Sequence, residues 1–267
     1  MIANSKTVKS IVKNTVSGKL TRCIIACLIP LFCGIILALV LGLLASATPK
    51  VVSLILSGLS YMFILFPLII GLLRFLVRLY LNNIQEDVIC VFHYFSSIQR
   101  YKRALSLQAS LLIRRLLIAL VIALPIFGVW LISNPLIYNQ FDFLMPVWAQ
   151  SLSYAVNILE IIGIFIYLLI TLRYYLAPFL FVADEEMDSS EAVYMSRLIS
   201  KRTVIDFVFL IFSYIPHIVL TLFLVPAIFT LPYLVLAYVV HSDSAVVQYN
   251  STVNTINCDG EFSVEGL

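Results

Sequence analysis

The sequence predicts an all-α, polytopic membrane protein with six transmembrane helices and two cytoplasmic amphipathic helices. Composition is the first observation: 62% of the 267 residues are hydrophobic and 12% are charged, whereas a soluble chain carries about 25% charged residues. Second, six apolar stretches are long enough to cross a hydrocarbon layer. Third, almost every basic residue falls on one side of them. The mean hydropathy of +1.05 argues against a disordered chain, a nucleic-acid-binding domain and a secreted disulfide scaffold.

The apolar stretches define a membrane domain over residues 23–240. A transmembrane helix needs about 20 apolar residues, and the last apolar run, Val204–Val240, is too long for one helix. It contains three prolines, and its segment Thr221–Pro226 predicts a tight reversal, so we divide it at Phe223. The predicted spans are residues 24–47, 51–73, 116–133, 152–172, 204–222 and 224–240. Residues 1–22 form a basic N-terminal tail, and residues 241–267 form a flexible tail.

The distribution of charge predicts the orientation. With six spans, all of the 17 Lys and Arg residues except Lys50 lie on one side. Positive loops stay in the cytoplasm, so both termini are expected there. The opposite side has one long loop, Asn134–Ser151, without a basic residue. Five aromatic residues in or beside it predict an aromatic belt at the membrane surface, and a ligand-stacking platform is the alternative: Trp130, Tyr138, Phe141, Phe143 and Trp148.

The first cytoplasmic connection, Glu86–Arg103, predicts an amphipathic helix that lies on the membrane. Five apolar residues form its stripe: Val88, Ile89, Val91, Phe92 and Phe95. Three cations follow, Arg100, Lys102 and Arg103, and such a basic end favours anionic lipid headgroups. We expect the lipid bilayer and these headgroups to be the partners here. Nucleic acid is not expected as a partner, because three charges beside membrane spans are too few.

The second cytoplasmic connection opens with an acidic patch, Asp184 to Asp188. Asp188 followed three residues later by Glu191 resembles a capping box and predicts a helix over Ser189–Lys201. Its expected apolar face comprises Ala192, Met195, Leu198 and Ile199. The patch has carboxylates for Mg²⁺ or Ca²⁺ but lacks the spacing of a calcium-binding loop. A solvated acidic face that complements the helix dipole is the favoured interpretation.

The same connection resembles a known family. The segment Arg173–Asp184, with its aromatic residues followed by Ala and Pro, leads through Ser190–Val193 into Ser196–Ile199. This pattern is similar to that of the bacterial integral membrane proteins called domain of unknown function 975. The resemblance implies a multi-pass protein of the bacterial plasma membrane, without an established activity. It singles out seven residues of the pattern: Tyr175, Ala177, Pro178, Asp184, Glu191, Ser196 and Arg197.

Glu160 is the outstanding polar residue within a span. It shares one helix face with four polar residues at steps of three, four and seven: Ser153, Asn157, Tyr167 and Thr171. An ionisable group in a span is costly and is therefore a functional candidate. His217, at comparable depth in the fifth span, is the expected partner, and the pair would relay protons or bind a cation. The alternative is a carboxyl group that hydrogen-bonds between packed helices.

The sequence predicts a non-enzymatic role, without a cofactor or metal site. It contains none of the GxSxG, HExxH, Walker or GxGxxG motifs. The expected function is to organise or regulate lipids or membrane partners through the amphipathic helices. The alternative is a small transporter with a polar path around Glu160. An unidentified membrane protein or a small solute would then be a further partner.

Overall fold

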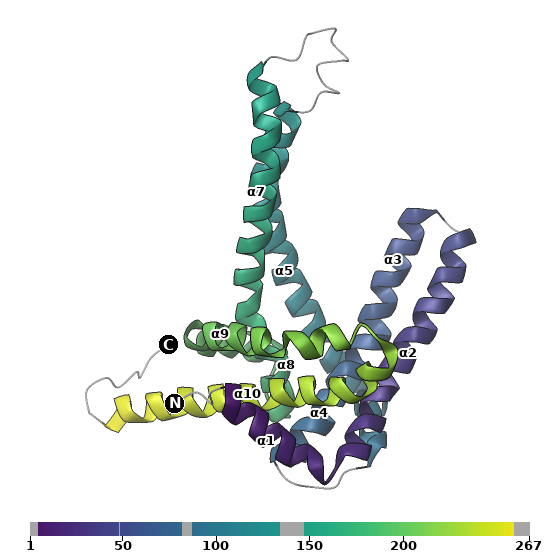
Figure 1. Cartoon of the computed structure of the whole chain (residues 1–267), viewed down its shortest axis with the longest axis vertical. Coiled ribbons are helices and arrows are strands. Elements are labelled where there is room, and N and C mark those ends of the chain that lie inside the picture. The colour runs from purple at the N-terminus through teal and green to yellow at the C-terminus, as the bar shows by residue number, and fades with distance from the viewer. Residues whose placement is uncertain (1–4, 48, 82–86, 134–146, 259–267) are drawn as a thin grey trace. The chain divides into compact units, whose positions relative to one another are not determined.

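The computed structural model describes residues 5–47, 49–81, 87–133 and 147–258, and every regular element in this part of the chain is helical (Figure 1). Within it, six helical stretches are long and apolar enough to cross a membrane: Leu20–Ser46, Lys50–Leu81, Ile98–Leu131, Tyr154–Ala183, Ser189–Leu220 and Pro226–Thr252. The all-α class and six apolar helices were predicted correctly, and they are compatible with a multi-pass membrane protein.

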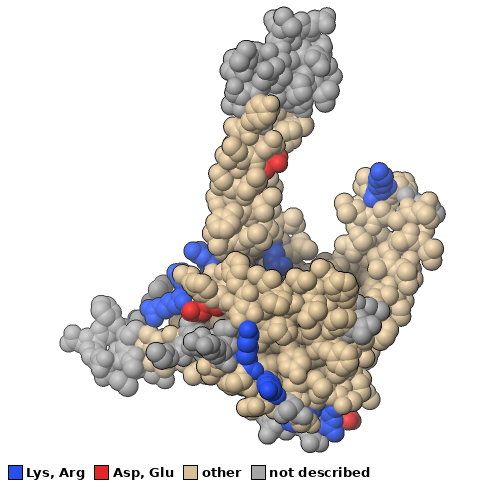
Figure 2. Space-filling model, viewed as in Figure 1, with Lys and Arg blue, Asp and Glu red and all other residues tan. Residues whose placement is uncertain are grey.

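The chain forms two compact units. The first comprises Met1–Gln108 and Leu176–Leu267, and the second comprises Ala109–Tyr175. The surfaces of two helix pairs, α2–α3 in the first unit and α5–α7 in the second, carry few charges over most of their length (Figure 2). An apolar surface of this kind suits a helix that faces lipid or another membrane helix.

The first unit begins with a short helix inside the predicted basic tail. This helix, α1 (Ser5–Ser17), buries Val8, Val12 and Val16, which recur every four residues and therefore share one face. α1 packs against α10 and is followed by α2 (Leu20–Ala47). The N-terminal segment is thus part of the packed structure.

The second span is longer than predicted. It consists of α3 (Lys50–Ser60), a π-helical turn η1 (Tyr61–Leu65) and α4 (Phe66–Leu81), which continue one another without a break. α4 is buried on almost every side. Arg74, expected in the connection after the span, instead lies inside α4 with 4% of its surface exposed.

The first predicted amphipathic α-helix takes a different form. Residues Val88–Phe95 form a 3₁₀-helix, η2, and α5 (Ile98–Ser133) begins three residues later. Side chains three apart share a face in a 3₁₀-helix, so Val91 and Tyr94 are buried together. The expected single apolar stripe is therefore divided. Glu86 lies outside the described residues.

Gly71 allows η2 to lie directly on α4. A Cβ atom at Gly71 would overlap the backbone carbonyl of Val91. A backbone atom cannot turn aside as a flexible side chain can. The close approach of these two elements therefore requires a residue without a side chain.

The second predicted amphipathic helix is the start of a longer one. After α8 (Ala177–Ala183), α9 runs unbroken from Ser189 to Leu220, because no Pro or Gly separates the expected cytoplasmic and spanning parts. The buried face differs from the expected one. It includes Ala192 and Ile199, whereas Met195 and Leu198 are partly exposed.

The long apolar run divides where the sequence predicted. α9 ends at Leu220, and α10 (Leu224–Cys258) begins after a turn at Thr221–Phe223. α10 continues through residues 241–258 in place of the flexible tail that was expected there. His241 and Ser242 are buried, because this part of the helix packs in the unit.

The second unit is an antiparallel helix pair (Figure 1). The later part of α5 lies beside α7 (Val147–Thr171), which is followed by the short 3₁₀-helix η3 (Leu172–Tyr174). Of the predicted aromatic belt, Tyr138, Phe141 and Phe143 and the side chain of Trp148 lie outside the described residues. Trp130 stacks on Phe127 with ring centroids 5.7 Å apart.

Substitution of Gly71 tests the contact between α4 and η2. We expect Gly71→Ala to lower the free energy of unfolding by about 1–3 kcal/mol, the usual cost of an added group in a packed interior. Gly42→Ala is the matched control, because nothing lies within 4 Å of a Cβ atom there. Thermal unfolding in detergent micelles measures both variants. Equal midpoints for the two would contradict the close approach.

Candidate functional site

The predicted intramembrane site lies on α7 in the second unit. Asn157 and Glu160 are exposed on this helix, and Tyr167 is half-buried. The hydroxyl of Thr171 donates to the carbonyl oxygen of Tyr167 at 2.8 Å. The side chain of Ser153 lies outside the described part. The helix therefore presents Glu160 and Tyr167 two turns apart on one side, as the spacing predicted.

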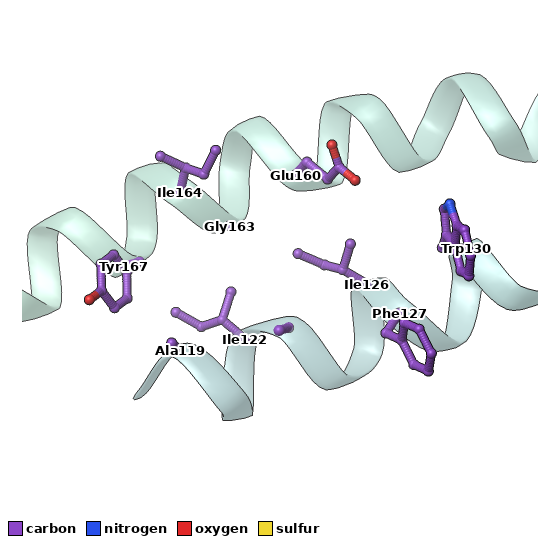
Figure 3. A pocket seen from close by; sticks show the side chains of 10 residues that line it. Ala119, Ile122, Ile126, Phe127, Trp130, Glu160, Gly163, Ile164 and Tyr167 are labelled. Carbon is purple, nitrogen blue, oxygen red and sulfur yellow. The ribbon is translucent and has the colours of Figure 1, made fainter. Parts of the chain in front are cut away.

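Glu160 and Tyr167 line a groove between α5 and α7 (Figure 3). The groove holds about 530 Å³. Its other lining residues are apolar or aromatic, namely Ala119, Ile122, Ala123, Ile126, Phe127, Trp130, Gly163 and Ile164. The sequence indicated the α7 side of this groove through the polar spacing, but nothing in it indicated which residues of α5 lie opposite.

Gly163 sets the distance between the two helices at the groove. A Cβ atom there would lie 2.8 Å from Cδ1 of Ile126 and 3.1 Å from Cγ2 of Ile122. The helices are thus in close contact at this level. Small residues permit such contact between membrane helices, and on α5 Ala119 and Ala123 leave the groove open beside it.

His217, the predicted partner of Glu160, lies near the end of α9 in the first unit. Its ring lies 5.3 Å from the ring of Tyr214, and among the described residues its Nδ1 atom is buried without a hydrogen-bond partner. Because Glu160 belongs to the other unit, the pairing of these residues stays a prediction.

The second predicted site, the cytoplasmic motif, lies beside a charged cluster in the first unit. This cluster consists of Arg74, Arg78, Arg103 and Glu185. The guanidinium of Arg74 donates to Oε1 of Glu185 from Nε at 3.0 Å and from Nη2 at 2.6 Å. Arg78 donates to the same oxygen atom. The side chain of Glu185 is 52% exposed, whereas that of Arg74 is 5% exposed. Glu185 therefore compensates a buried charge and is not part of a fully solvated acidic face.

The rest of the acidic turn is also bound within the chain. Oδ1 of Asp184 accepts from the backbone N–H of Glu186 at 2.9 Å, and Asp188 caps α9 by accepting from the N–H of Ser190 at 3.3 Å. The predicted start of this helix is confirmed. Within the described residues, no three His, Cys, Asp or Glu side chains gather at a metal site.

Arg103, in the first turns of α5, contacts the turn between α8 and α9. Its guanidinium donates to the carbonyl oxygen of Met187 at 2.8 Å and lies 5.2 Å from the ring centre of Phe181. Phe181 stacks in turn on Tyr94, at 6.2 Å between ring centroids. Arg103 was expected to face lipid headgroups, but it instead holds the turn between α8 and α9.

The remaining residues of the motif divide into two groups. Ala177 and Ser196 are fully buried, so these two serve the packing of α8 and α9. The others are partly or fully exposed. They are Tyr175 after η3, Pro178 at the start of α8, and Asp184, Glu191 and Arg197 in the acidic turn and on α9.

Burial and charge set the protonation of the groups around Arg74. Burial, together with the positive charges of Arg74 and Arg100, lowers the pKa of His93 to about 4. Burial raises the pKa of Tyr94 to about 12. The hydrogen bond from Arg74 lowers the pKa of Glu185. At pH 7 the guanidiniums of Arg74 and Arg78 therefore share the carboxylate of Glu185 beside a neutral imidazole.

Comparison of the chain with family models, curated proteins and solved structures found no match. The resemblance to the family of domain of unknown function 975 therefore stays a prediction that rests on the motif alone.

Removal of the carboxylate tests the charged cluster. We expect Glu185→Gln to lower the free energy of unfolding by about 1–3 kcal/mol, because it leaves the buried guanidinium of Arg74 without a compensating negative charge. Glu186→Gln, in the same turn, is the control and should be near neutral. Combining Glu185→Gln with Arg74→Met should cost less than the sum of the single changes. Strict additivity in chemical denaturation would contradict the pairing.

The lowered pKa of His93 predicts a dependence of stability on pH. The unfolded state, with a histidine pKa of about 6.5, binds more protons than the folded state between pH 6.5 and pH 4. The contribution of neutral His93 to the free energy of unfolding is therefore complete above pH 6.5, and it is lost as the pH falls from 6.5 to 4. We expect the midpoint of thermal unfolding to fall from pH 7 to pH 5, and His93→Gln to reduce that fall. An identical fall in the His93→Gln variant would contradict the role of His93 in this pH dependence.

Proposed function

We propose that this protein is a non-enzymatic organiser of a bacterial plasma membrane, and that its first unit binds anionic lipid headgroups at the cytoplasmic leaflet. The observation that carries the proposal is the face of η2 that is not buried against α4. Ile89, Phe92 and Phe95 recur every three residues and therefore share one side of the 3₁₀-helix. They are 76%, 42% and 42% exposed, respectively. Three large apolar side chains on one exposed face favour contact with acyl chains.

A pocket of about 350 Å³ adjoins this face. The exposed apolar residues of η2 line it on one side, and Cys90 and His93, with Ser96 directly after η2, line it on the other. Because His93 is neutral at pH 7, it adds no charge to this wall. The pocket therefore offers an apolar space for part of a lipid chain.

One cation lies at the rim of the same pocket, because Nη1 of Arg100 donates to the hydroxyl oxygen of Ser96 at 3.0 Å. Lys102, two residues further along α5, is a second exposed cation close to η2 in the sequence. An apolar surface beside cations is the pattern of a site for an anionic amphiphile. Glu185, the nearby carboxylate, already accepts hydrogen bonds from Arg74 and Arg78.

In this proposal η2 and both termini face the cytoplasm. The support is the distribution of charge along the sequence, since every Lys and Arg except Lys50 falls on the same side of the six predicted spans. Anionic lipids enrich the cytoplasmic leaflet and attract basic segments there.

A carrier for a small solute is the second candidate. The groove that contains Glu160 favours it, because an ionisable group within a span commonly marks a solute or ion pathway. A carrier moves its solute across a sealed vesicle, whereas a lipid-binding organiser does not.

The lipid proposal is tested by the lipids that the purified protein retains. We expect native mass spectrometry of the protein from mixed phosphatidylglycerol and phosphatidylcholine micelles to show selective retention of phosphatidylglycerol. Arg100→Ala, combined with Lys102→Ala, should remove that selectivity, because each basic residue near a membrane surface contributes about 1 kcal/mol.

Two variants control this experiment. Lys50→Ala removes a cation at the opposite end of the second span and should keep the selectivity. Phe92→Ser keeps the charges but weakens the apolar face and should reduce the total lipid retained. Undiminished selectivity in the Arg100 and Lys102 double variant would overturn the proposal.

A further inference from the structure

We infer that the groove between α5 and α7 binds an apolar organic cation. Its charge would pair with Glu160, and its apolar part would lie against the aromatic rings of Phe127 and Trp130. This inference names a ligand class for the second candidate function. It does not depend on lipid binding by the first unit, because every lining residue of the groove belongs to the second unit.

The groove has the size and the lining of a small-molecule site. Its volume of about 530 Å³ falls within the range of roughly 300–1,000 Å³ that is usual for ligand pockets. The space is a consequence of side-chain size: Ala119 and Ala123 on α5 are too short to fill it. Gly163 keeps the two helices close, so that the groove has walls on both sides.

The charge of the groove favours a cation. Glu160 is the one carboxylic acid among the described lining residues, and within the described part of the second unit no side chain forms a hydrogen bond or ion pair with it. A carboxylate in apolar surroundings is costly unless an opposite charge compensates it. A bound cation supplies that charge, whereas an anion or a neutral apolar molecule does not.

The aromatic side chains favour an organic cation over a metal ion. Phe127 and Trp130 stack on one another at the end of the groove that holds Glu160, and Tyr167 lies at the other end (Figure 3). Aromatic faces attract cations with apolar substituents. Mg²⁺ and Ca²⁺ require several oxygen ligands, and the described lining offers side-chain oxygen atoms from Glu160 and Tyr167 alone.

Two probes of the same shape and opposite charge test the inference. Tetraphenylphosphonium is a cation with four phenyl groups, and tetraphenylborate is the corresponding anion. We expect the full-length protein in nanodiscs of zwitterionic lipid to bind the phosphonium saturably in equilibrium dialysis, after subtraction of empty nanodiscs. The borate should show no saturable binding. Zwitterionic lipid separates this test from that of the anionic-lipid site.

Glu160→Gln should weaken phosphonium binding by about tenfold or more, equivalent to about 1.4 kcal/mol. Glu186→Gln is the matched control outside the groove and should bind as the unchanged protein does. A second pair of variants tests the space and keeps Glu160. Ala123→Phe fills the groove and should abolish binding, whereas Val121→Phe, at an exposed position of α5 outside the lining, should not.

Circular dichroism and size-exclusion chromatography establish that each variant is folded, and Glu160→Asp replaces Glu160→Gln if the latter is not. The aspartate should then retain more binding than Ala123→Phe. Absence of saturable phosphonium binding, equal binding of the borate, or undiminished binding by either Glu160→Gln or Ala123→Phe would overturn the inference.

Discussion

A buried guanidinium determines how the first unit is assembled. Arginine keeps its charge in a protein, so Arg74 inside α4 needs an acceptor that the apolar residues around it do not supply. Glu185 provides one from a position 111 residues further along the chain. This ion pair fixes the turn after α8 against α4. The same turn carries the Asp188 cap of α9 and the carbonyl group that Arg103 binds, so several elements depend on one charge.

The close contact between α4 and η2 determines what the first unit presents to its surroundings. Gly71 lets the backbone of η2 lie on α4, and the threefold repeat of the 3₁₀-helix then divides its side chains. Val91 and Tyr94 turn inward, whereas Ile89, Phe92 and Phe95 turn outward beside Arg100. An element of eight residues thus both packs the unit and forms the surface on which the lipid proposal rests.

Arg74 and Glu160 illustrate two outcomes for an ionisable group on an apolar helix. Arg74 has partners within its own unit, so its role is structural. Glu160 lines a groove whose other described residues are apolar or aromatic, apart from the hydroxyl of Tyr167. Its carboxyl group is therefore the candidate binding group of the proposed site. An ionisable side chain with hydrogen-bond partners in its own unit serves the structure, whereas one without such partners is a candidate binding group.

The sequence by itself determined the helical class, six apolar helices, a break near Phe223 and the Asp188 cap, because composition, hydropathy and caps are local properties. Tertiary structure decided the Arg74–Glu185 pair and the α5 side of the groove, since these join residues that are remote in the chain. It also decided the placement of the 3₁₀-helix η2 on α4, where the backbone of Val91 lies directly over Gly71. The full lengths of α9 and α10 arise where packing extends an apolar helix into a polar segment.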